Sequence, residues 1–233
     1  MVHRVDGPIG VYRGYDDGTD QRIEEINHEL AQATIVQSEY SLRRHRELGI
    51  ELRDPRVIRN TVDPELFNEA GRERYRGGRR LRLITTSWSD NPRKGAATIA
   101  WLEQRLDWSR YEFTFVGRTS RGFERVRTID PVPSHELGEL LRAHDVFLAA
   151  GHDDPCSNAL LEALACGLPA VYRLSGGNAE LVGDAGLGFS ADEEIPDLLE
   201  RAAGEWDDLH ARIDVEPLQE VAGRYLAVLG VER

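Results

Sequence analysis

Lysine is almost absent from this chain of 233 residues: Lys94 is the only one, and arginine supplies the other basic side chains. Basic residues are also outnumbered, since 29 Lys and Arg stand against 41 Asp and Glu, which gives a net charge of −12. A negative protein repels the backbone of nucleic acids and the headgroups of anionic lipids. The composition therefore argues against a nucleic-acid-binding protein and favours a small-molecule site or a protein partner.

The sequence also lacks long apolar runs and a cysteine framework. No run approaches the roughly 18 residues of a membrane-spanning helix, and the first residues lack the apolar core of a secretory signal. Cys156 and Cys166 are ten positions apart in a helix-like stretch, where they fall on different faces, so we expect no disulfide between them. We expect a cytoplasmic protein, with contact to a membrane surface left open.

Short apolar runs alternate with stretches of helical periodicity along most of the chain. This alternation predicts an α/β fold: a Rossmann-like, doubly wound parallel sheet preceded by a partial second α/β region. After residue 80 we expect strands over 81–86, 112–116, 126–129, 145–149 and 169–173, and helices over 96–106, 135–143 and 157–166. Before residue 60 we expect helices over 23–33 and 40–48 and strands over 34–37 and 57–58.

These patterns divide the chain into four parts. Residues 1–60 are the partial region, residues 61–80 a linker, residues 81–215 the Rossmann-like domain, and residues 216–233 a covering helix with apolar positions at helical spacing. Six arginines lie between residues 72 and 82. A solvated surface loop is the favoured interpretation of this run, and contact with phosphate is the alternative.

A polar loop joins a predicted buried strand to a predicted helix between residues 145 and 166. The free backbone N–H groups of residues 156–159 then face the carboxyl edge of the sheet, and such a helix start binds anions, phosphate above all. Asp154 precedes this helix and Glu162 lies inside it eight positions later. Two carboxylates at that spacing can both reach one ligand.

Residues 162–169, Glu-Ala-Leu-Ala-Cys-Gly-Leu-Pro, resemble a Glu-Ala-x-Ala-x-Gly-x-Pro run of the family 4 glycosyltransferases, retaining enzymes of the GT-B fold. In that family a Glu-x7-Glu motif leads into the run, and Asp154 and Glu162 stand at its two glutamates. Residues 175–182 are similar to the family's Gly-Gly-x-x-Glu turn, and residues 57–63 to its Val-Ile-Pro-Asn-Gly-Val-Asp segment. The resemblance covers roughly residues 55–230.

The resemblance implies that this domain binds a nucleotide-diphosphate sugar. Glu162 would hold the ribose hydroxyls, Asp154 would hydrogen-bond the transferred sugar, and the amides near Ser157 and Asn158 would cradle the diphosphate. The loop residues Pro155 and Cys156 would lie against the same ligand. Asp154 is one methylene shorter than the family's glutamate, and an ordinary helix N-cap or first-turn acid is its alternative role.

Lys94 falls at a second motif, because the family has a Lys-Gly pair here, with an arginine five residues earlier. Ser89 takes the place of that arginine, and Arg93 is the neighbouring positive charge. The resemblance implies that Lys94 and Asp154 are the catalytic pair, with Lys94 neutralising the charge of the departing diphosphate. A solvated lysine at a helix start is the alternative for Lys94.

Three weaker signals remain. Ile129 falls where the family's backbone contacts the nucleotide base, although a core position explains it equally well. Arg4, Asp6, Arg13 and Asp16 follow a short N-terminal strand and either face a cleft or form surface salt bridges. The adjacent His152, Asp153 and Asp154 are a weak metal set without a distant fourth ligand, and we expect neither a metal ion nor a cofactor.

The resemblance therefore implies a glycosyltransferase that transfers a sugar, with retained configuration, to a glycan, lipid or small-molecule acceptor. A complete enzyme of this fold needs two domains of about 150 residues or more each, and only roughly 60–70 residues precede the donor domain. We expect the earlier acceptor-side part to be missing or supplied by another chain, and the open region to self-associate or to bind a partner chain. Two alternatives stay open: a non-catalytic nucleotide-sugar-binding subunit and a sugar-nucleotide epimerase of the same fold.

Overall fold

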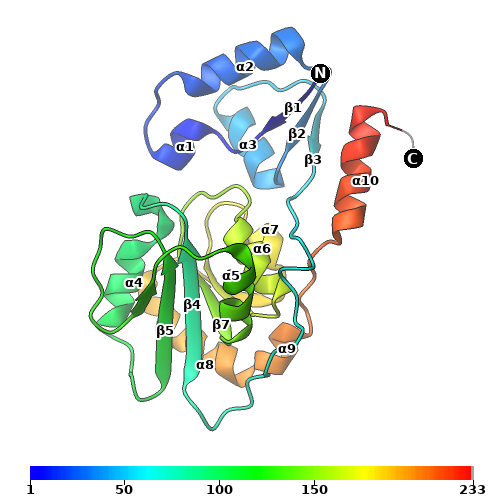
Figure 1. The fold of residues 1–233 in the computed structure, drawn as a ribbon. Coiled ribbons are helices and arrows are strands. Elements are labelled where there is room, and N and C mark those ends of the chain that lie inside the picture. Colours follow the sequence, from blue (N-terminus) through cyan, green and yellow to red (C-terminus); the bar gives the residue numbers. More distant parts are fainter. Residues whose placement is uncertain (232–233) are drawn as a thin grey trace.

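The computed structural model describes residues 1–231, which form two parallel β-sheets, one above the other in Figure 1. The first sheet has the order β1–β2–β3, and the second has the order β6–β5–β4–β7–β8–β9. We call residues 1–58 the first unit and residues 81–210 the second unit. The expected doubly wound parallel sheet, preceded by a smaller α/β region, is confirmed.

The first unit contains β1 (Val2–Val5), α1 (Ile9–Arg13), α2 (Thr19–Leu30), β2 (Ala33–Val36), α3 (Glu39–Glu47) and β3 (Pro55–Val57). The second unit begins with β4 (Leu81–Ser87), the 3₁₀ turn η1 (Pro92–Lys94), α4 (Ala96–Glu103), β5 (Tyr111–Gly117), β6 (Arg127–Ile129) and α5 (Ser134–Arg142). It continues with β7 (Val146–Ala149), α6 (Asn158–Ala165), β8 (Ala170–Arg173), α7 (Asn178–Val182), β9 (Gly186–Phe189), η2 (Asp192–Glu194), α8 (Ile195–Gly204) and α9 (Trp206–His210). The last helix is α10 (Leu218–Leu229).

Two apolar layers cover the second sheet, one on each face. Adjacent residues of a strand point to opposite faces, so Leu83 packs with α4, α8 and α9 while Ile84 packs with α5, α6 and α7. Both side chains are completely buried. This burial on both faces explains why the central strands read as continuous apolar runs rather than as alternating ones.

The course of the chain indicates at which edge of this sheet a ligand site is expected. From β4 the chain moves outward to β5 and β6, and it then returns to the other side of β4 as β7. The strand order therefore reverses between β4 and β7. In open parallel sheets, the crevice at the carboxyl ends of such a strand pair is where ligands bind.

The last helix crosses from the second unit back to the first. Val221 of α10 is buried against Ile35 and Ile58, and Tyr225 and Val228 pack on the same cluster. Figure 1 shows α10, in red, beside the first sheet. Its apolar periodicity indicates a covering helix but does not indicate which sheet it covers.

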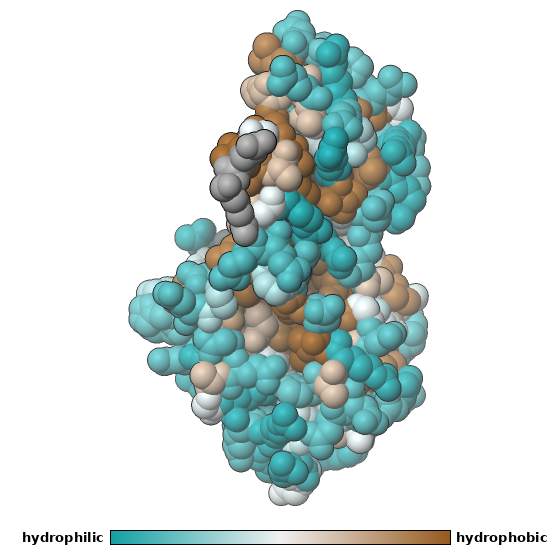
Figure 2. Space-filling view, turned by 90° about the vertical axis from the view of Figure 1, so that its right-hand side faces the viewer, coloured by the Kyte–Doolittle hydropathy of each residue, from teal (hydrophilic) through white to brown (hydrophobic). Residues whose placement is uncertain are grey.

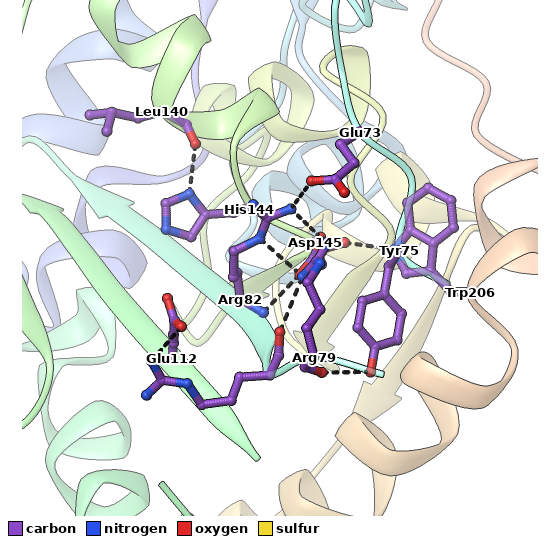
Figure 3. A network of polar contacts seen from close by, with 10 residues as sticks. Glu73, Tyr75, Arg79, Arg82, Glu112, Leu140, His144, Asp145 and Trp206 are labelled. Atoms are coloured by element: carbon purple, nitrogen blue, oxygen red, sulfur yellow. Dashed lines mark hydrogen bonds and ion pairs between the residues drawn. The ribbon is translucent and has the colours of Figure 1, made fainter. Parts of the chain in front are cut away.

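The arginine-rich segment before β4 is a largely exposed loop, as expected, but Arg72 and Arg79 of this loop are packed on the second unit. The guanidinium of Arg72 lies 5.1 Å from the ring centre of Trp206 and donates to the Cys166 carbonyl at 3.1 Å. Arg79 forms two hydrogen bonds, of 2.6 and 2.8 Å, with the buried carboxylate of Asp145. Figure 3 shows this network at the start of β7, on the side of the sheet opposite its carboxyl ends. These arginines hold the segment on the second unit through a buried carboxylate and a tryptophan.

Both cysteines are buried free thiols, and burial raises the pKa of each to about 11. Within residues 1–231, no helix has the length and apolar character to cross a bilayer.

Candidate active site

A cavity of about 540 Å³ lies between the two units. The second unit contributes the segments that follow β4 and β7, together with the first residues of α6. The first unit contributes Arg4 of β1 and residues that follow β1 and β2, namely Asp6, Gly7, Ile9, Tyr12 and Gln37. Figure 2 shows the molecule narrowing to a waist between an upper and a lower body. The cavity therefore stands at the carboxyl edge of the second sheet, where the strand order reverses.

The loop after β7 ends in a capped helix start. Ser157 is the N-cap of α6, because its Oγ accepts a hydrogen bond from the backbone N–H of Leu160 at 3.4 Å. Ser157, Asn158 and Ala159 line the cavity, so the positive end of the helix dipole faces it. Asp154 lies three residues before the cap and is not the N-cap that we held open as its alternative role.

Lys94 and Asp154 form an ion pair in the cavity wall. The Nζ atom of Lys94 lies 2.8 Å from Oδ2 of Asp154, and the side chains are 26% and 17% exposed. Burial lowers the pKa of Lys94, but the charge of Asp154 and the hydrogen bond to it outweigh this effect, so the pKa lies above its usual value. The ring of Tyr12, from the first unit, lies 5.1 Å from the same ammonium. Lys94 is thus a partly buried cation that is fixed by an ion pair, and not a solvated surface lysine.

Glu162 lines a second hollow of about 400 Å³, which shares Arg4, Asn60 and Asn158 with the cavity. No hydrogen bond to the Glu162 carboxylate is formed by the part of the chain that the structure describes. Burial raises the pKa of this carboxyl to about 7. An unpaired acid in a half-buried hollow retains its full capacity to bind hydroxyl groups.

A hydrogen-bonded chain crosses between the two hollows. Arg4 donates to Asn60 at 3.0 Å, and Asn60 donates to Asn158 of α6 at 2.7 Å. Arg4 also pairs with Asp6, at 3.1 Å. Arg4 and Asp6, which the N-terminal sequence cluster contained, therefore face the cleft. Arg13 of that cluster instead forms a surface pair with Asp17.

The structure brings most of the predicted site residues together. Besides Lys94 and Asp154, those that line the cavity are Ser89, Pro155, Cys156, Ser157 and Asn158. The Oγ atom of Ser89 is buried and has no hydrogen-bond partner among the described residues. Arg93 does not line the cavity, because its guanidinium pairs with Asp153. Ile129 lines neither hollow and packs against the apolar layer of α5 and α6.

Several contacts of this region escaped the sequence analysis. Asp153 accepts hydrogen bonds from Tyr40 and Ser175, which come from the first unit and from the segment after β8. Tyr12 and Asn60 reach the site from the first unit and from the segment after β3. Asn60 could have been found, because it stands at the asparagine of the family's Val-Ile-Pro-Asn-Gly-Val-Asp segment. The tyrosines carry no local sequence signal that points to a ligand.

The described residues contain no cluster of three His, Cys, Asp or Glu side chains that is placed to hold a metal ion. Burial and the nearby positive charge of Arg173 lower the pKa of His152, which precedes Asp153.

Residues 96–205 match the family model of the glycosyl transferases of group 1. A D-inositol 3-phosphate glycosyltransferase of Streptosporangium roseum is 34% identical over 71 residues, which are 30% of this chain and 16% of that protein. The chain therefore matches only a small part of this relative's length.

Two solved structures resemble nearly the whole chain. Anabaena HepE in complex with UDP-glucose superposes with a TM-score of 0.78 at 16% identity, over 98% of this chain and 71% of that one. The sucrose-phosphate synthase of Thermosynechococcus elongatus superposes with a TM-score of 0.76 at 16% identity, over 98% of this chain and 67% of that one. At these identities the similarity shows the fold, which is of the GT-B type.

Proposed function

We propose that this chain is the donor-binding part of a retaining glycosyltransferase of family 4, which transfers a sugar from a nucleotide-diphosphate sugar to an acceptor. The observation that carries the proposal is the pairing of Lys94 with Asp154 beside the start of α6, inside the cavity between the units. The match of residues 96–205 to group 1 glycosyl transferases supports it. So does the fold shared with HepE, whose structure contains UDP-glucose.

The diphosphate of the donor is proposed to lie between Lys94 and the first N–H groups of α6. An ammonium has three N–H donors, so Lys94 can keep its hydrogen bond to Asp154 and also donate to a phosphate oxygen. The helix start adds free N–H groups and a partial positive charge. Together they stabilise the negative charge that grows on the diphosphate as the bond to the sugar breaks.

The two carboxylates are proposed to hold the two ends of the donor. Asp154 already bonds Lys94 and the backbone N–H of Cys156, the latter at 3.2 Å. A carboxylate accepts about four hydrogen bonds, so capacity remains for a sugar hydroxyl. Glu162, with its unpaired carboxylate in the adjoining hollow, is proposed to accept from the ribose hydroxyls. The retaining stereochemistry rests on the motif resemblance.

The acceptor is proposed to approach from the first unit. Asp6, Tyr12 and Gln37 line that side of the cavity and offer hydrogen bonds to a hydroxyl-bearing glycan, lipid or small molecule.

The first sheet of the described chain has three strands, so β1 and β3 have unpaired edges. We expect such edges to seek a partner chain or a second copy, which the elution volume in gel filtration tests.

The first test is binding of UDP and UDP-glucose to the purified chain by calorimetry. Lys94→Ala should abolish or strongly weaken both interactions. Its control is Arg80→Ala, which removes an exposed cation just before β4 that pairs with Glu112 of β5. Where turnover is measurable, Lys94→Ala should reduce it by a factor of about 10² to 10³. If the chain binds neither UDP, GDP nor ADP, nor their sugars, the proposal is wrong.

The second test follows the sugar by NMR in the presence of candidate acceptors. A transferred sugar with unchanged anomeric configuration supports the proposal. A donor that is isomerised without any acceptor indicates the epimerase alternative. Binding with neither transfer nor hydrolysis, also after a partner chain is added, indicates the non-catalytic subunit.

A further inference from the structure

Two adjacent ion pairs join η1 to the loop after β7. Lys94 pairs with Asp154, and Arg93 pairs with Asp153. The backbone N–H of His152 also donates to the Arg93 carbonyl at 2.8 Å, so the two segments are fixed in register. The Lys94–Asp154 pair lines the cavity, whereas the Arg93–Asp153 pair stands behind it.

Asp153 has a left-handed backbone, with a φ of +52°. A residue other than glycine keeps such a conformation only where its surroundings hold it, and these positions gather at functional sites. Ser175 holds both parts of the residue: its Oγ accepts from the Asp153 N–H at 2.9 Å and donates to Asp153 Oδ1 at 3.2 Å. Because Asp154 is the next residue, the backbone of Asp153 sets the direction in which the Asp154 side chain leaves the loop.

Gly176 packs against the same loop. A Cβ atom at Gly176, which has a φ of +68°, would lie 2.2 Å from the Asp154 carbonyl oxygen. The loop that carries both aspartates is therefore clamped between η1 on one side and the segment after β8 on the other.

The remaining contact to Asp153 comes from the first unit. The hydroxyl of Tyr40, on α3, donates to Asp153 Oδ1 at 2.9 Å. The backbone of the same helix start is bound as well, because the N–H groups of Glu39 and Tyr40 donate to the Glu180 carboxylate at 2.9 and 2.6 Å. Glu180 lies on α7 of the second unit. Tyr40, which is 8% exposed, is thus attached to the second unit at its backbone and at its hydroxyl.

We propose that Tyr40 and Asp153 are positioning residues through which the docking of α3 on the second unit fixes the Lys94–Asp154 pair. Docking places the Tyr40 hydroxyl on Asp153, Asp153 orders the loop, and the loop holds Asp154 against Lys94. The second unit clamps the loop by itself, and the pair is then fully preorganised when the two units are closed on each other. The inference rests on the proposed function for the role of the pair, but the coupling itself is a property of the protein without donor.

The single lysine makes this coupling measurable. Protein labelled with ¹³C-lysine gives one lysine side-chain signal, that of Lys94, and its pH titration reports the Lys94 pKa without any ligand. The test variant is Tyr40→Phe, which removes one hydroxyl and no charge. The matched control is Tyr111→Phe, at the start of β5. It removes a hydrogen bond of 2.7 Å from the tyrosine hydroxyl to the carboxylate of Glu200, on α8. A second variant, Glu180→Ala, releases the backbone of α3 instead of the hydroxyl.

We expect Tyr40→Phe and Glu180→Ala to lower the Lys94 pKa towards that of a free lysine, because Asp154 no longer holds the ammonium closely. We expect them to weaken UDP-glucose binding by about tenfold, the effect of one hydrogen bond to a charged group. Tyr111→Phe should change neither quantity. An unchanged Lys94 pKa in both test variants, or an equal change in the control, overturns the inference. If the Lys94 pKa falls but the wild-type protein binds no nucleotide sugar, the coupling stands and the proposed function fails.

Discussion

One aspartate precedes strand β7 and another lies in the loop that follows it, and the two carboxylates differ in the number of hydrogen bonds that they accept. Asp145, just before the strand, is completely buried and accepts five hydrogen bonds of 2.6 to 3.2 Å from Arg79 and Arg82. Figure 3 shows the two guanidinium groups converging on it. Asp154, after the strand, accepts from Lys94 and from one backbone N–H, and it lines a cavity of about 540 Å³.

The difference indicates which aspartate has a structural role and which can bind a ligand. A carboxylate has about four lone-pair sites, so Asp145 is saturated by the protein and has no capacity left for a ligand. Asp154 keeps part of its capacity and faces open volume at the carboxyl edge, where α/β sheets bind ligands. Ion pairing of a carboxylate stabilises the fold before β7, whereas after β7 it leaves acceptor capacity that we propose the donor uses.

The largest effect is expected from Asp145→Asn. Removing one partner of a buried ion pair costs about 3–5 kcal/mol, because the remaining charges lose their compensation. Urea denaturation should therefore show a free energy of unfolding lower by about that amount. Asp154→Asn serves as the control and should cost less than half as much. Equal losses in the two variants would mean that bonding of the carboxylate does not distinguish the two ends of the strand.

A smaller and more selective effect is expected from Asp154→Asn on ligand binding. If Asp154 accepts from the transferred sugar, the variant should bind UDP-glucose at least about tenfold more weakly, since hydrogen bonds to charged groups are worth about 1.5–3 kcal/mol. The affinity for UDP, which has no sugar beyond the ribose, should fall less, because UDP loses only the positioning of Lys94 by Asp154. Calorimetry with both ligands measures the contrast. Equal losses for UDP and UDP-glucose would show that Asp154 does not contact the sugar.

The fold of the second unit was predictable because its central strands are buried on both faces. β4, β5, β7 and β8 read as apolar runs, and each lies within two residues of its expected bounds. β9 escaped prediction because its sequence, Gly-Leu-Gly-Phe, has two glycines and little β-propensity. The five-residue helix α1 is too short to show a period.

The candidate site was predictable only where its residues are neighbours in the sequence. Asp154, Ser157 and Glu162 belong to one loop and helix, so their proximity follows from local structure. Arg93 was expected to add a second positive charge beside Lys94, but it pairs with Asp153, 60 positions away. Tyr40 and Asp153 are 113 positions apart, and only the docking of the two units brings them together.

Glu162 is a third case, because its carboxylate has no hydrogen-bond or ion-pair partner among the described residues. Its pKa lies near 7 in the folded protein and at 4.5 when unperturbed. As the pH rises through this interval, the unfolded chain loses its proton first, so the stability of wild-type protein falls until the pH exceeds about 7. A glutamine does not ionise, so its burial does not destabilise the folded protein as the pH rises. Glu162→Gln should therefore be more stable than wild type at pH 8 and equally stable at pH 4.

The same substitution should weaken UDP binding, because an amide replaces a carboxylate that is proposed to accept from the ribose. A variant that gains stability and loses affinity is typical of a group kept for function rather than for folding. Melting temperatures at pH 8, 6 and 4 test the gain in stability, and UDP titrations test the loss of affinity. A stability difference that does not depend on pH would show that the Glu162 carboxyl titrates normally.

The smallest effect on stability is expected at an ion pair that also joins an arginine to a carboxylate, as in the Asp145 network, but is exposed to solvent. Arg80, just before β4, pairs with Glu112 of β5 at 2.7 Å, and the two side chains are 51% and 45% exposed. Exposed pairs contribute about 0–1 kcal/mol, because water and salt screen the charges. Glu112→Gln should therefore lower the free energy of unfolding by less than about 1 kcal/mol, and added salt should remove the difference. A loss close to that of Asp145→Asn would mean that burial is not what gives the Asp145 network its strength.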